Sequence, residues 1–387
     1  MKTLFNDGWQ FFEVPLSSSQ MEKDGKPVLL EPADFYDGFE KLNPVDFKAL
    51  NVPHDWMITD TRDLYRSSVG YYKKTFELGD VAGKHFAVNF EGVYMNSAVF
   101  VNGKLAGNWK YGYSAFEFDI SSLVNTGTNE IVVICVYQSP NTRWYSGAGI
   151  FRDVTFIETE NNFIVSDGTY IRVRKISDGG EGKSGKWQVK IRTEAAIESD
   201  VEKYEIRHTL FEVPTLEQKQ KAFAISGHAD VLGDSLRGIN TEFSPLEFLS
   251  EEENKEFTNV VCGVAGRKIA VSECVFEINN PKLWDTENPT LYFMSTELVR
   301  KNSGLFGSAL DSVLEHTAFR TIEYSNDEGF FLNGKHTKIY GVCQHHDLGG
   351  LGSAFDKNVL KRQLIRLKEM GVNGIRTSHN PVTKDFF

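Results

Sequence analysis

The hydrophobic pattern of this 387-residue chain changes its period once, just after Gly329. Before that point, apolar residues form short runs between turn residues, a pattern typical of strands. After it, residues 338–343 and 372–377 form two strand-like runs, and residues 357–370 between them carry an apolar stripe of helical period. A strand, a helix and a strand in this order predict a β-α-β unit, and such a unit requires a parallel sheet.

The stripe of this helix consists of Val359, Leu360, Leu364, Leu367 and Met370. Asp356 stands where it can cap the helix N-terminus, and Gly371 stands where the helix should end. Two parallel strands with one helix cannot cover both faces of a sheet, and they leave an open edge. The sequence therefore predicts an incomplete last domain, in a chain that either continues in the functional protein or is a truncated remnant.

Residues 1–162 predict an all-β sandwich. The dipeptide Asn102-Gly103 favours a tight hairpin turn, because both residues readily adopt positive φ angles. The β-branched run at 131–137 is long enough for a strand that is buried on both faces. No segment of this region keeps a convincing helical period.

Residues 163–325 predict a second sandwich. Its expected strands lie at 170–173, 187–191, 204–210 and 291–298, at the spacing of a second β-sandwich. The segment 215–256 between them is polar and irregular, and we interpret it as a solvated excursion. With the β-α-β start at 326–387, the chain therefore divides into three expected domains, 1–162, 163–325 and 326–387, in agreement with its length.

Charge and cysteine usage limit the partners and the compartment. The chain has 42 basic and 53 acidic residues, a net charge of −11, and no basic stripe that could follow phosphates, which argues against nucleic acid. No apolar run is long enough to span a membrane, and no secretory signal is visible. The four cysteines lie far apart without a Cys-x-x-Cys pair, which fits reduced thiols. We therefore expect a cytoplasmic protein, although a removed leader would leave no trace.

Aromatic residues make up 13% of the chain, and several stand beside Gly or Asn in loop-like contexts. Sugar rings present apolar C–H faces that stack on aromatic faces, so this composition suggests a carbohydrate site. Aromatic-rich sandwich cores explain the composition equally well.

Eight short segments carry a family resemblance. They are NVPHDW at 51–56, EGVYMNS at 91–97, NG at 102–103, YGYSAF at 111–116, NTRWYSGAGIFRDV at 141–154, DEGFFLNG at 327–334, YGVCQHHD at 340–347 and GVNGIRTSHNP at 371–381. In this order, and over nearly the whole chain, they resemble family-2 glycoside hydrolases of the β-galactosidase type. The resemblance implies a mainly β chain with a jelly-roll sugar-binding domain, an immunoglobulin-like β-sandwich and the truncated start of a (β/α)₈ TIM barrel.

Retaining hydrolysis needs a carboxylic acid that protonates the leaving oxygen and a carboxylate about 5 Å away that attacks the anomeric carbon. The resemblance places both glutamates on barrel strands beyond Phe387. No residue of this chain is therefore assigned as catalytic, and we expect the 387-residue chain alone to be inactive.

The candidate substrate-binding residues lie at the ends of the two barrel strands, because that edge of a (β/α)₈ barrel lines the active site. His345, His346 and Asp347 end the first strand, and Arg376 and His379 lie at the end of the second. The resemblance implies that His345 and His379 hydrogen-bond the sugar or its transition state. It also implies that Arg376 orients the surroundings of the nucleophile.

A loop of the first domain supplies four more candidates. By resemblance, the loop at 141–145 reaches over the barrel mouth and contacts the galactosyl ring. Arg143 is the strongest candidate in it, Trp144 or Tyr145 is the expected ring wall, and Asn141 is the remaining member.

Several residues have alternative interpretations. Adjacent strand residues point to opposite faces, so residues 345–347 are poorly placed to bind one metal ion. Asp347 is a weak candidate for an acid or a base. His54 and Asp55 could form an oriented pair or could stabilise a local turn, and Trp56 is expected in the core rather than against a ligand, as is Trp284.

The leading hypothesis is an exo-acting retaining β-galactosidase that cleaves terminal non-reducing β-D-galactosides. A β-glucuronidase or a β-mannosidase on the same scaffold is the nearest alternative, and a non-catalytic carbohydrate-binding remnant is the alternative from another class. The expected partner is a β-galactoside, with neither nucleic acid nor membrane, and a homo-oligomer is left open. No cofactor or metal site is evident, although the resemblance makes Mg²⁺ or Na⁺ a candidate ion of the full-length enzyme.

Overall fold

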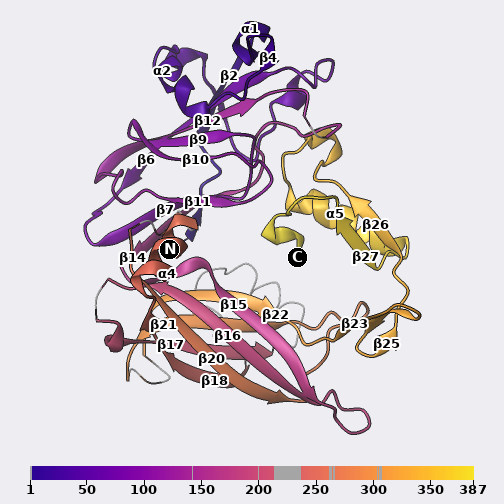
Figure 1. Ribbon diagram of the computed structural model, residues 1–387. Coiled ribbons are helices and arrows are strands. Elements are labelled where there is room, and N and C mark those ends of the chain that lie inside the picture. Colours follow the sequence, from indigo (N-terminus) through magenta and orange to yellow (C-terminus); the bar gives the residue numbers. More distant parts are fainter. Residues whose placement is uncertain are drawn as a thin grey trace. The chain divides into compact units, whose positions relative to one another are not determined.

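The computed structural model describes residues 2–141, 143–198, 200–212, 237–260, 264, 266–302, 304 and 307–387. The chain forms two compact units. One, called here the jelly-roll unit, combines Lys2–Glu158 with Tyr340–Phe387, and the other, the sandwich unit, is Thr159–Ile339 (Figure 1). The barrel segment at the end of the chain therefore belongs to the same unit as the first domain.

Two antiparallel sheets form most of the jelly-roll unit. One has the order β1 (Lys2–Leu4), β14 (Val154–Glu160), β7 (Lys84–Phe90), β11 (Phe116–Asp119). The other has the order β10 (Lys104–Trp109), β9 (Ser97–Val101), β12 (Gly127–Tyr137), β6 (Ser68–Leu78), β2 (Trp9–Pro15), β5 (Lys48–Leu50). Two separate two-stranded sheets complete the strands of this unit before the barrel segment. One pairs β13 (Gly149–Ile150) with β8 (Val93–Tyr94), and the other pairs β3 (Glu22–Lys23) with β4 (Lys26–Pro27).

Strand β12 lies inside the larger sheet and is buried on both faces. It pairs with β6 on one side and with β9 on the other. Val132, Ile134 and Val136 pack on one face, beneath the short helices η1 (Pro32–Phe35) and α2 (Tyr36–Phe39). The alternate residues 131, 133 and 135 are fully buried on the other face. The strand expected at 131–137 is confirmed.

The hairpin between β9 and β10 turns at the expected dipeptide. Asn102 has φ 48° and Gly103 has φ 78°. Two consecutive positive φ angles give the turn the twist of the flanking strands.

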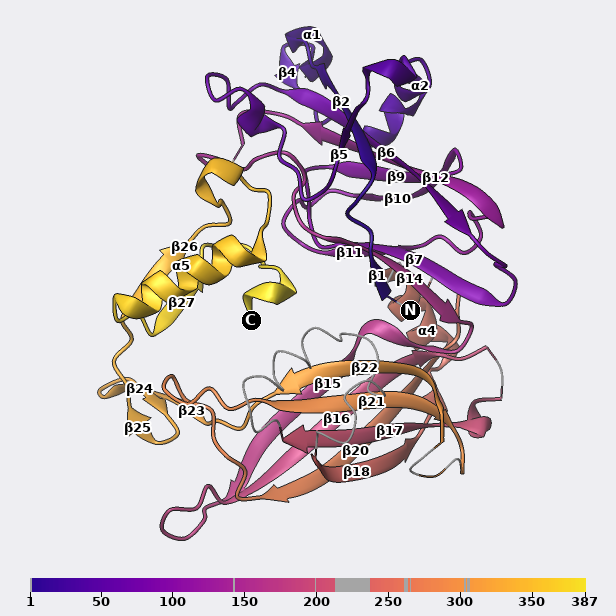
Figure 2. The ribbon, with the colours of Figure 1, turned by 180° about the vertical axis from the view of Figure 1, so that it is seen from behind.

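The barrel segment is a parallel β-α-β unit, as the sequence predicts. Strands β26 (Gly341–Gln344) and β27 (Gly374–Thr377) pair in parallel, and α5 (Lys357–Glu369) lies beside them (Figures 1 and 2). Asp356 caps the helix, since its Oδ1 accepts hydrogen bonds from the backbone N–H groups of Asn358 and Val359 at 2.8 and 2.9 Å. Of the predicted apolar stripe only Leu360 is fully buried, whereas Met370 is 75% exposed. The described residues therefore cover the stripe only in part.

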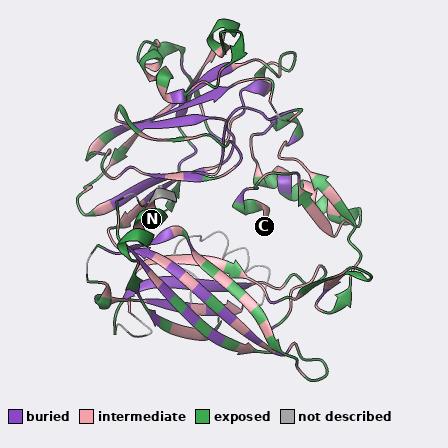
Figure 3. Ribbon diagram, viewed as in Figure 1, coloured by how far each residue is buried: buried purple, intermediate pink, exposed green. Residues whose placement is uncertain are grey.

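Two four-stranded sheets form the sandwich unit. One has the order β15 (Phe163–Ser177), β16 (Lys186–Ala196), β20 (Ile269–Asn279), β19 (Glu247–Phe248). The other has the order β18 (Arg237–Pro245), β17 (Tyr204–Glu212), β21 (Tyr292–Arg300), β22 (Ala309–Thr317). Buried and exposed residues alternate along β16 and β20 (Figure 3), which is the pattern of strands with one face in a core. A small sheet of β23 (Ile322–Ser325), β24 (Gly329–Leu332) and β25 (Lys335–His336) follows.

Large rings from both sheets meet in the core of the sandwich unit. The ring of Phe319 contacts Trp187 edge-on at 5.6 Å and Tyr292 at 4.9 Å between centroids. All three side chains are almost fully buried. Such aromatic pairs contribute beyond the area that they bury.

The interpretation of 215–256 as an irregular excursion is wrong for its second half. Residues 213–236 lie outside the described part of the chain, but β18, β19 and a helix, α4 (Glu251–Val260), lie beyond them. The helix begins with a reciprocal cap, because the backbone N–H of Ser250 donates to Glu253 and the backbone N–H of Glu253 donates to the Ser250 hydroxyl. The acidic run at 251–253 is the first turn of a helix, where negative charge is favourable.

Cys135, Cys274 and Cys343 are free thiols, and Cys262 lies outside the described residues. Within the described part of the chain, no helix is both long and apolar enough to cross a membrane.

Burial of His208 in the sandwich unit predicts a pH-dependent stability. The side chain is 1% exposed, and burial lowers its pKa from 6.5 to about 4. The unfolded chain therefore binds this proton at a higher pH than the folded chain does, so stability should fall as the pH drops from about 7 towards 4. His208→Gln should reduce the loss of unfolding free energy between pH 7 and pH 4.5 by about 2 kcal/mol. Urea unfolding at both pH values measures this. His336→Gln, at an exposed histidine, is the control, and equal effects of the two substitutions would contradict the prediction.

Candidate functional site

The two barrel strands bring their candidate histidines to the same edge. His345 follows the end of β26 and His379 follows the end of β27, and their ring centroids are 6.0 Å apart. His379 has φ 77°, a backbone conformation that residues other than glycine rarely adopt. Such strained positions cluster at functional sites.

Arg376 sets the tautomer of His379. The Nη2 of Arg376 lies 2.8 Å from Nδ1 of His379, and because a guanidinium can only donate, Nδ1 must accept. Loss of solvation, followed by the positive charges of Arg376, Arg143 and His345, lowers the pKa of His379. The ring is therefore neutral at pH 7 and carries its proton on Nε2, which can donate a hydrogen bond.

The loop at 141–145 runs directly into Ser146, whose carbonyl oxygen lies 3.0 Å from Nε2 of His346 at the end of the first barrel strand, and the charge of Arg143 contributes to the lowered pKa of His379. Trp144 is 62% exposed. Asn141 has a local role: its Oδ1 accepts a hydrogen bond from the hydroxyl of Ser146 at 2.9 Å, which shapes the loop. Thr142 lies outside the described residues.

Tyr145 differs from the ring wall that the sequence suggests. Its side chain is 8% exposed, and its hydroxyl donates a 2.5 Å hydrogen bond to Oδ2 of Asp55. Of the two neighbouring rings, only that of Trp144 is exposed enough to stack on a ligand.

His346 and Asp347 lie beside the jelly-roll loops. The Nε2–H of His346 donates to the carbonyl oxygen of Ser146 at 3.0 Å, and its ring packs edge-on against Tyr113, 5.0 Å between centroids. Burial lowers the pKa of His346, which keeps the ring neutral. Asp347 is half-buried, and its charge helps to raise the pKa of Tyr145, after burial and Asp55.

The loop that follows β27 is also tied to the jelly roll. The buried guanidinium of Arg152 donates to the carbonyl oxygens of Glu91, Tyr113 and Pro381 at 3.2, 3.0 and 2.8 Å. Thr383 donates to the Glu91 carboxylate at 2.6 Å. Burial lowers the pKa of Arg152 to about 10, so the group stays charged at neutral pH.

A pocket opens among these segments. It is lined by Phe151, Arg152, Gln344, His345, His346, Leu348, Ser353, Phe355, Leu360, Thr377, Ser378, Asn380, Pro381, Val382, Thr383 and Phe386. Gln344 Oε1, Ser378 Oγ and Asn380 Nδ2 are buried there and have no hydrogen-bond partner among the described residues. Buried polar atoms normally find partners, so the pocket has hydrogen-bonding capacity for a polar group that enters it.

Of the two interpretations of His54 and Asp55 that the sequence left open, the structure supports the turn-stabilising one and contradicts the oriented pair. His54 Nδ1 pairs with the hydroxyl of Tyr72 at 2.8 Å, so the two residues are not an oriented pair. Asp55 bonds within its own turn but also to Ser353, 298 residues away. Trp56 lies in the core as expected, with no exposed surface, and Trp284 is half-buried.

The sequence therefore predicted most of the residues that lie at this edge, but not the side chains that hold them in place. Arg376, His345, His379 and the loop with Arg143 meet as expected. The supporting groups Glu91, Tyr111, Arg152, Ser353 and Thr383 were not singled out, although three of them fall within the quoted motifs. Tyr111 belongs with them because its hydroxyl donates to Oδ1 of Asn380 at 3.2 Å. Among the described residues, no group of three or more His, Cys, Asp or Glu side chains is arranged to hold a metal ion.

Three family models match the chain. Residues 41–160 match the sugar binding domain of the glycosyl hydrolases family 2, residues 169–320 match glycosyl hydrolases family 2, and residues 324–387 match the TIM barrel domain of that family.

Curated relatives and solved structures agree with the family models. A beta-galactosidase of Bacteroides ovatus is 31% identical over 366 residues, which cover 89% of this chain and 37% of the relative. A putative beta-glucuronidase of Formosa agariphila is 27% identical over 100% of this chain and 32% of its own length. The structure of a beta-glycosidase from Bacteroides vulgatus is similar with a TM-score of 0.71 and 26% identity, over 100% of this chain and 42% of that one. The chain thus spans less than half the length of these relatives.

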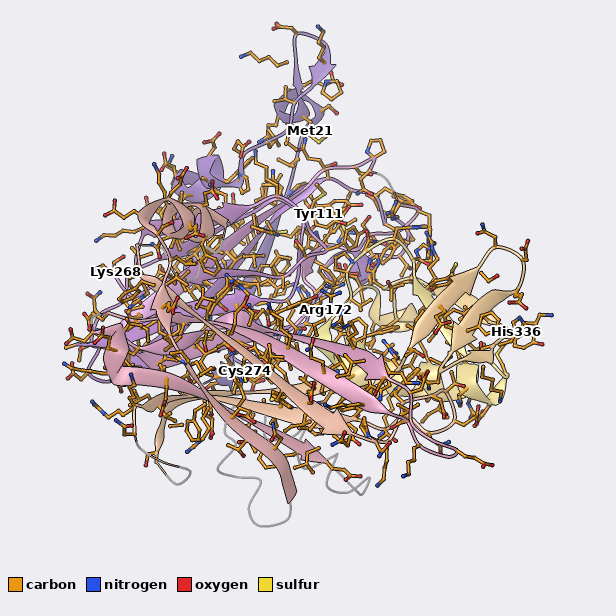
Figure 4. All side chains as sticks on the ribbon, turned by 60° about the horizontal axis from the view of Figure 1, so that its bottom comes forward. Met21, Tyr111, Arg172, Lys268, Cys274 and His336 are labelled. Atoms are coloured by element: carbon orange, nitrogen blue, oxygen red, sulfur yellow. The ribbon has the colours of Figure 1, made fainter. Side chains whose placement is uncertain are left out.

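The buried guanidinium of Arg152 predicts a large effect of its removal. Arg152→Met should lower the free energy of unfolding by on the order of 3 kcal/mol, because three buried carbonyl oxygens lose a charged donor. Urea denaturation followed by tryptophan fluorescence measures this. Arg172→Met is the matched control, because Arg172 is exposed on β15 (Figure 4), and its effect should stay within about 0.5 kcal/mol. Similar losses for the two variants would contradict the structural role of Arg152.

Proposed function

Because this chain belongs to glycosyl hydrolase family 2, we propose that it is the sugar-binding part of a retaining glycosidase that removes terminal non-reducing β-D-galactosyl residues. One observation carries the proposal. Two histidines at the ends of the barrel strands, His345 and His379, lie at the same edge as the loop of Arg143 and the exposed Trp144. Fixed polar groups beside an exposed aromatic ring are the usual composition of a sugar site.

Each of these side chains has a role that follows from its chemistry. The indole of Trp144 can stack on the apolar C–H face of a pyranose. The Nε2–H of His379 is free of the contact with Arg376 and can donate to a sugar hydroxyl. Arg143 can donate to ring hydroxyls or to an acidic substituent.

Hydrolysis itself needs two carboxylates about 5 Å apart, one as acid and then base, the other as nucleophile. A barrel of two strands cannot hold them in that geometry, so this proposal assigns them to further barrel strands, for which the relatives have the length. The described residues bind and orient the sugar, and the covalent step belongs to the rest of the barrel.

A β-glucuronidase is the second candidate, and one observation favours it. Arg143 and Arg376 both act electrostatically on the same histidine, so the edge is rich in positive charge. Arginine is well suited to pair with a carboxylate, and a glucuronide differs from a galactoside by carrying one. A relative named as a putative beta-glucuronidase aligns with the whole chain.

The choice between these sugars can be measured on the longer protein that contains this chain. We expect the kcat/KM for nitrophenyl β-galactoside to exceed that for the β-glucuronide and the β-mannoside at least tenfold. Arg143→Ala should raise KM for the galactoside about tenfold, which corresponds to about 1.4 kcal/mol of lost binding. A larger effect of Arg143→Ala on a preferred glucuronide would instead establish the second candidate.

The 387-residue chain by itself should not hydrolyse nitrophenyl β-galactoside, because the family resemblance places both catalytic carboxylates on later barrel strands. A colorimetric assay at high protein concentration tests this, with the longer protein as the positive control. Turnover by the purified chain would show that its catalytic groups lie within residues 1–387. Sugar binding without turnover by the longer protein would favour the non-catalytic alternative.

A further inference from the structure

One buried carboxylate in the jelly-roll unit receives five hydrogen bonds. Asp55 is 2% exposed. Its Oδ1 accepts from the backbone N–H groups of Met57 and Ala148, both at 3.0 Å. Its Oδ2 accepts from the hydroxyl of Tyr145 at 2.5 Å and from Ser353, through the backbone N–H at 2.8 Å and through the hydroxyl at 3.0 Å.

These donors come from three separate parts of the chain. Met57 belongs to the turn of Asp55 itself, whereas Tyr145 and Ala148 continue the loop that carries Arg143. Ser353 ends the first barrel loop, which follows β26. A carboxylate can serve all three at once because both of its oxygens only accept. An amide in the same place would turn an NH₂ group towards N–H or O–H donors.

The backbone is shaped for this contact. Gly147 has φ 68°, and a Cβ atom there would lie 2.0 Å from the Ser353 hydroxyl. Gly352 has φ 62°, and its Cβ atom would lie 2.3 Å from Oδ2 of Asp55. Only glycine allows both the conformation and the close approach. The two loops therefore meet at the carboxylate with no space for a side chain between them.

We propose that Asp55 is a positioning residue that fastens the sugar-facing loop, residues 141–148, to the first barrel loop, residues 345–353. Through Tyr145 and Ala148, it fixes Arg143 and Trp144 relative to the barrel strand ends, where His345 and His379 lie. Its role in catalysis rests on the proposed glycosidase function, whereas the fastening itself is a property of this chain.

A second contact holds the same loop from its other side. The hydroxyl of Tyr65 donates to the carbonyl oxygen of Trp144 at 2.6 Å. The peptide of Trp144 is thus held by Tyr65, while the next residue is held by Asp55. An exposed indole on an immobilised backbone loses little entropy when it binds a ligand.

The competing explanation is that Asp55 only stabilises its own turn, through the bond from Met57. That role would confine the effect of a substitution to residues 55–59. Fastening predicts instead that two distant segments, 145–149 and 348–353, loosen together. This difference can be measured without enzymatic activity.

Hydrogen exchange of the purified chain tests the fastening. In Asp55→Asn, amide exchange should accelerate about tenfold or more in peptides covering 145–149 and in peptides covering 348–353. Peptides from the sandwich unit should exchange as in the unsubstituted chain. Acceleration confined to residues 55–59 would overturn the proposal.

Ser353→Ala is a milder variant that keeps the test decisive if Asp55→Asn does not fold. It removes one hydroxyl from the barrel side, yet it should accelerate exchange at 145–149 on the jelly-roll side. Ser121→Ala is the matched control, because the Ser121 hydroxyl accepts from the backbone N–H of Phe86 at 2.9 Å within the same unit and makes none of the hydrogen bonds to Asp55. An equal effect of Ser121→Ala on 145–149 would contradict the proposal.

The longer protein gives the catalytic readout. Ser353→Ala and Tyr145→Phe should raise KM for the preferred glycoside about tenfold with a smaller change in kcat, because the sugar-facing loop is displaced while the catalytic carboxylates are not. Ser121→Ala should leave both constants unchanged, and an unchanged KM in all three variants would overturn the role in positioning. If the unsubstituted longer protein hydrolyses no glycoside, the proposed function fails, and the exchange experiment still decides whether Asp55 fastens the loops.

Discussion

Two buried charged side chains, each hydrogen-bonded to uncharged groups, hold the jelly-roll unit together near the ends of β26 and β27. Asp55 receives five hydrogen bonds from backbone and hydroxyl donors, and Arg152 gives three to backbone carbonyl oxygens. A buried charge is costly unless its hydrogen bonds are complete, so each group tolerates only one arrangement of the loops around it. The two-stranded sheet of β26 and β27 would be unstable alone, and these contacts attach its two loops to a large sheet core.

The attachment decides what chemistry this edge can perform. It adds the loop of Arg143 to the edge where the barrel strands already place Arg376, His345 and His379, and the positive charges of the arginines help to lower the pKa of His379. A neutral histidine with a fixed tautomer is a directional donor, which suits the recognition of a hydroxyl. Relatives of this chain carry the names of both beta-galactosidases and beta-glucuronidases. Under the proposed function, a few donors at the strand ends recognise the sugar, so changes in a few side chains would suffice to change the preferred sugar.

The sandwich unit is stabilised by apolar packing rather than by buried charges. Its sheets hold together through alternating apolar residues and a cluster of aromatic rings around Phe319. That alternation is readable along β16 and β20, whereas α4 was missed because only two of its ten residues, Phe257 and Val260, are apolar. The reciprocal contact between Ser250 and Glu253 was the local signal that marked the helix start.

The sequence by itself determined the elements that depend on neighbours in the chain. The buried strand at 131–137, the turn at Asn102-Gly103 and the helix capped by Asp356 follow from local periodicity and capping chemistry. The family motifs also indicated the edge to which His345 and His379 belong. Only the tertiary structure decided that Tyr145 faces Asp55 rather than a ligand, and that Asp55 reaches Ser353 across 298 residues. Hydrogen bonds between distant segments form when the whole unit closes around a buried charge, and no local pattern of residue types records which donors will meet there.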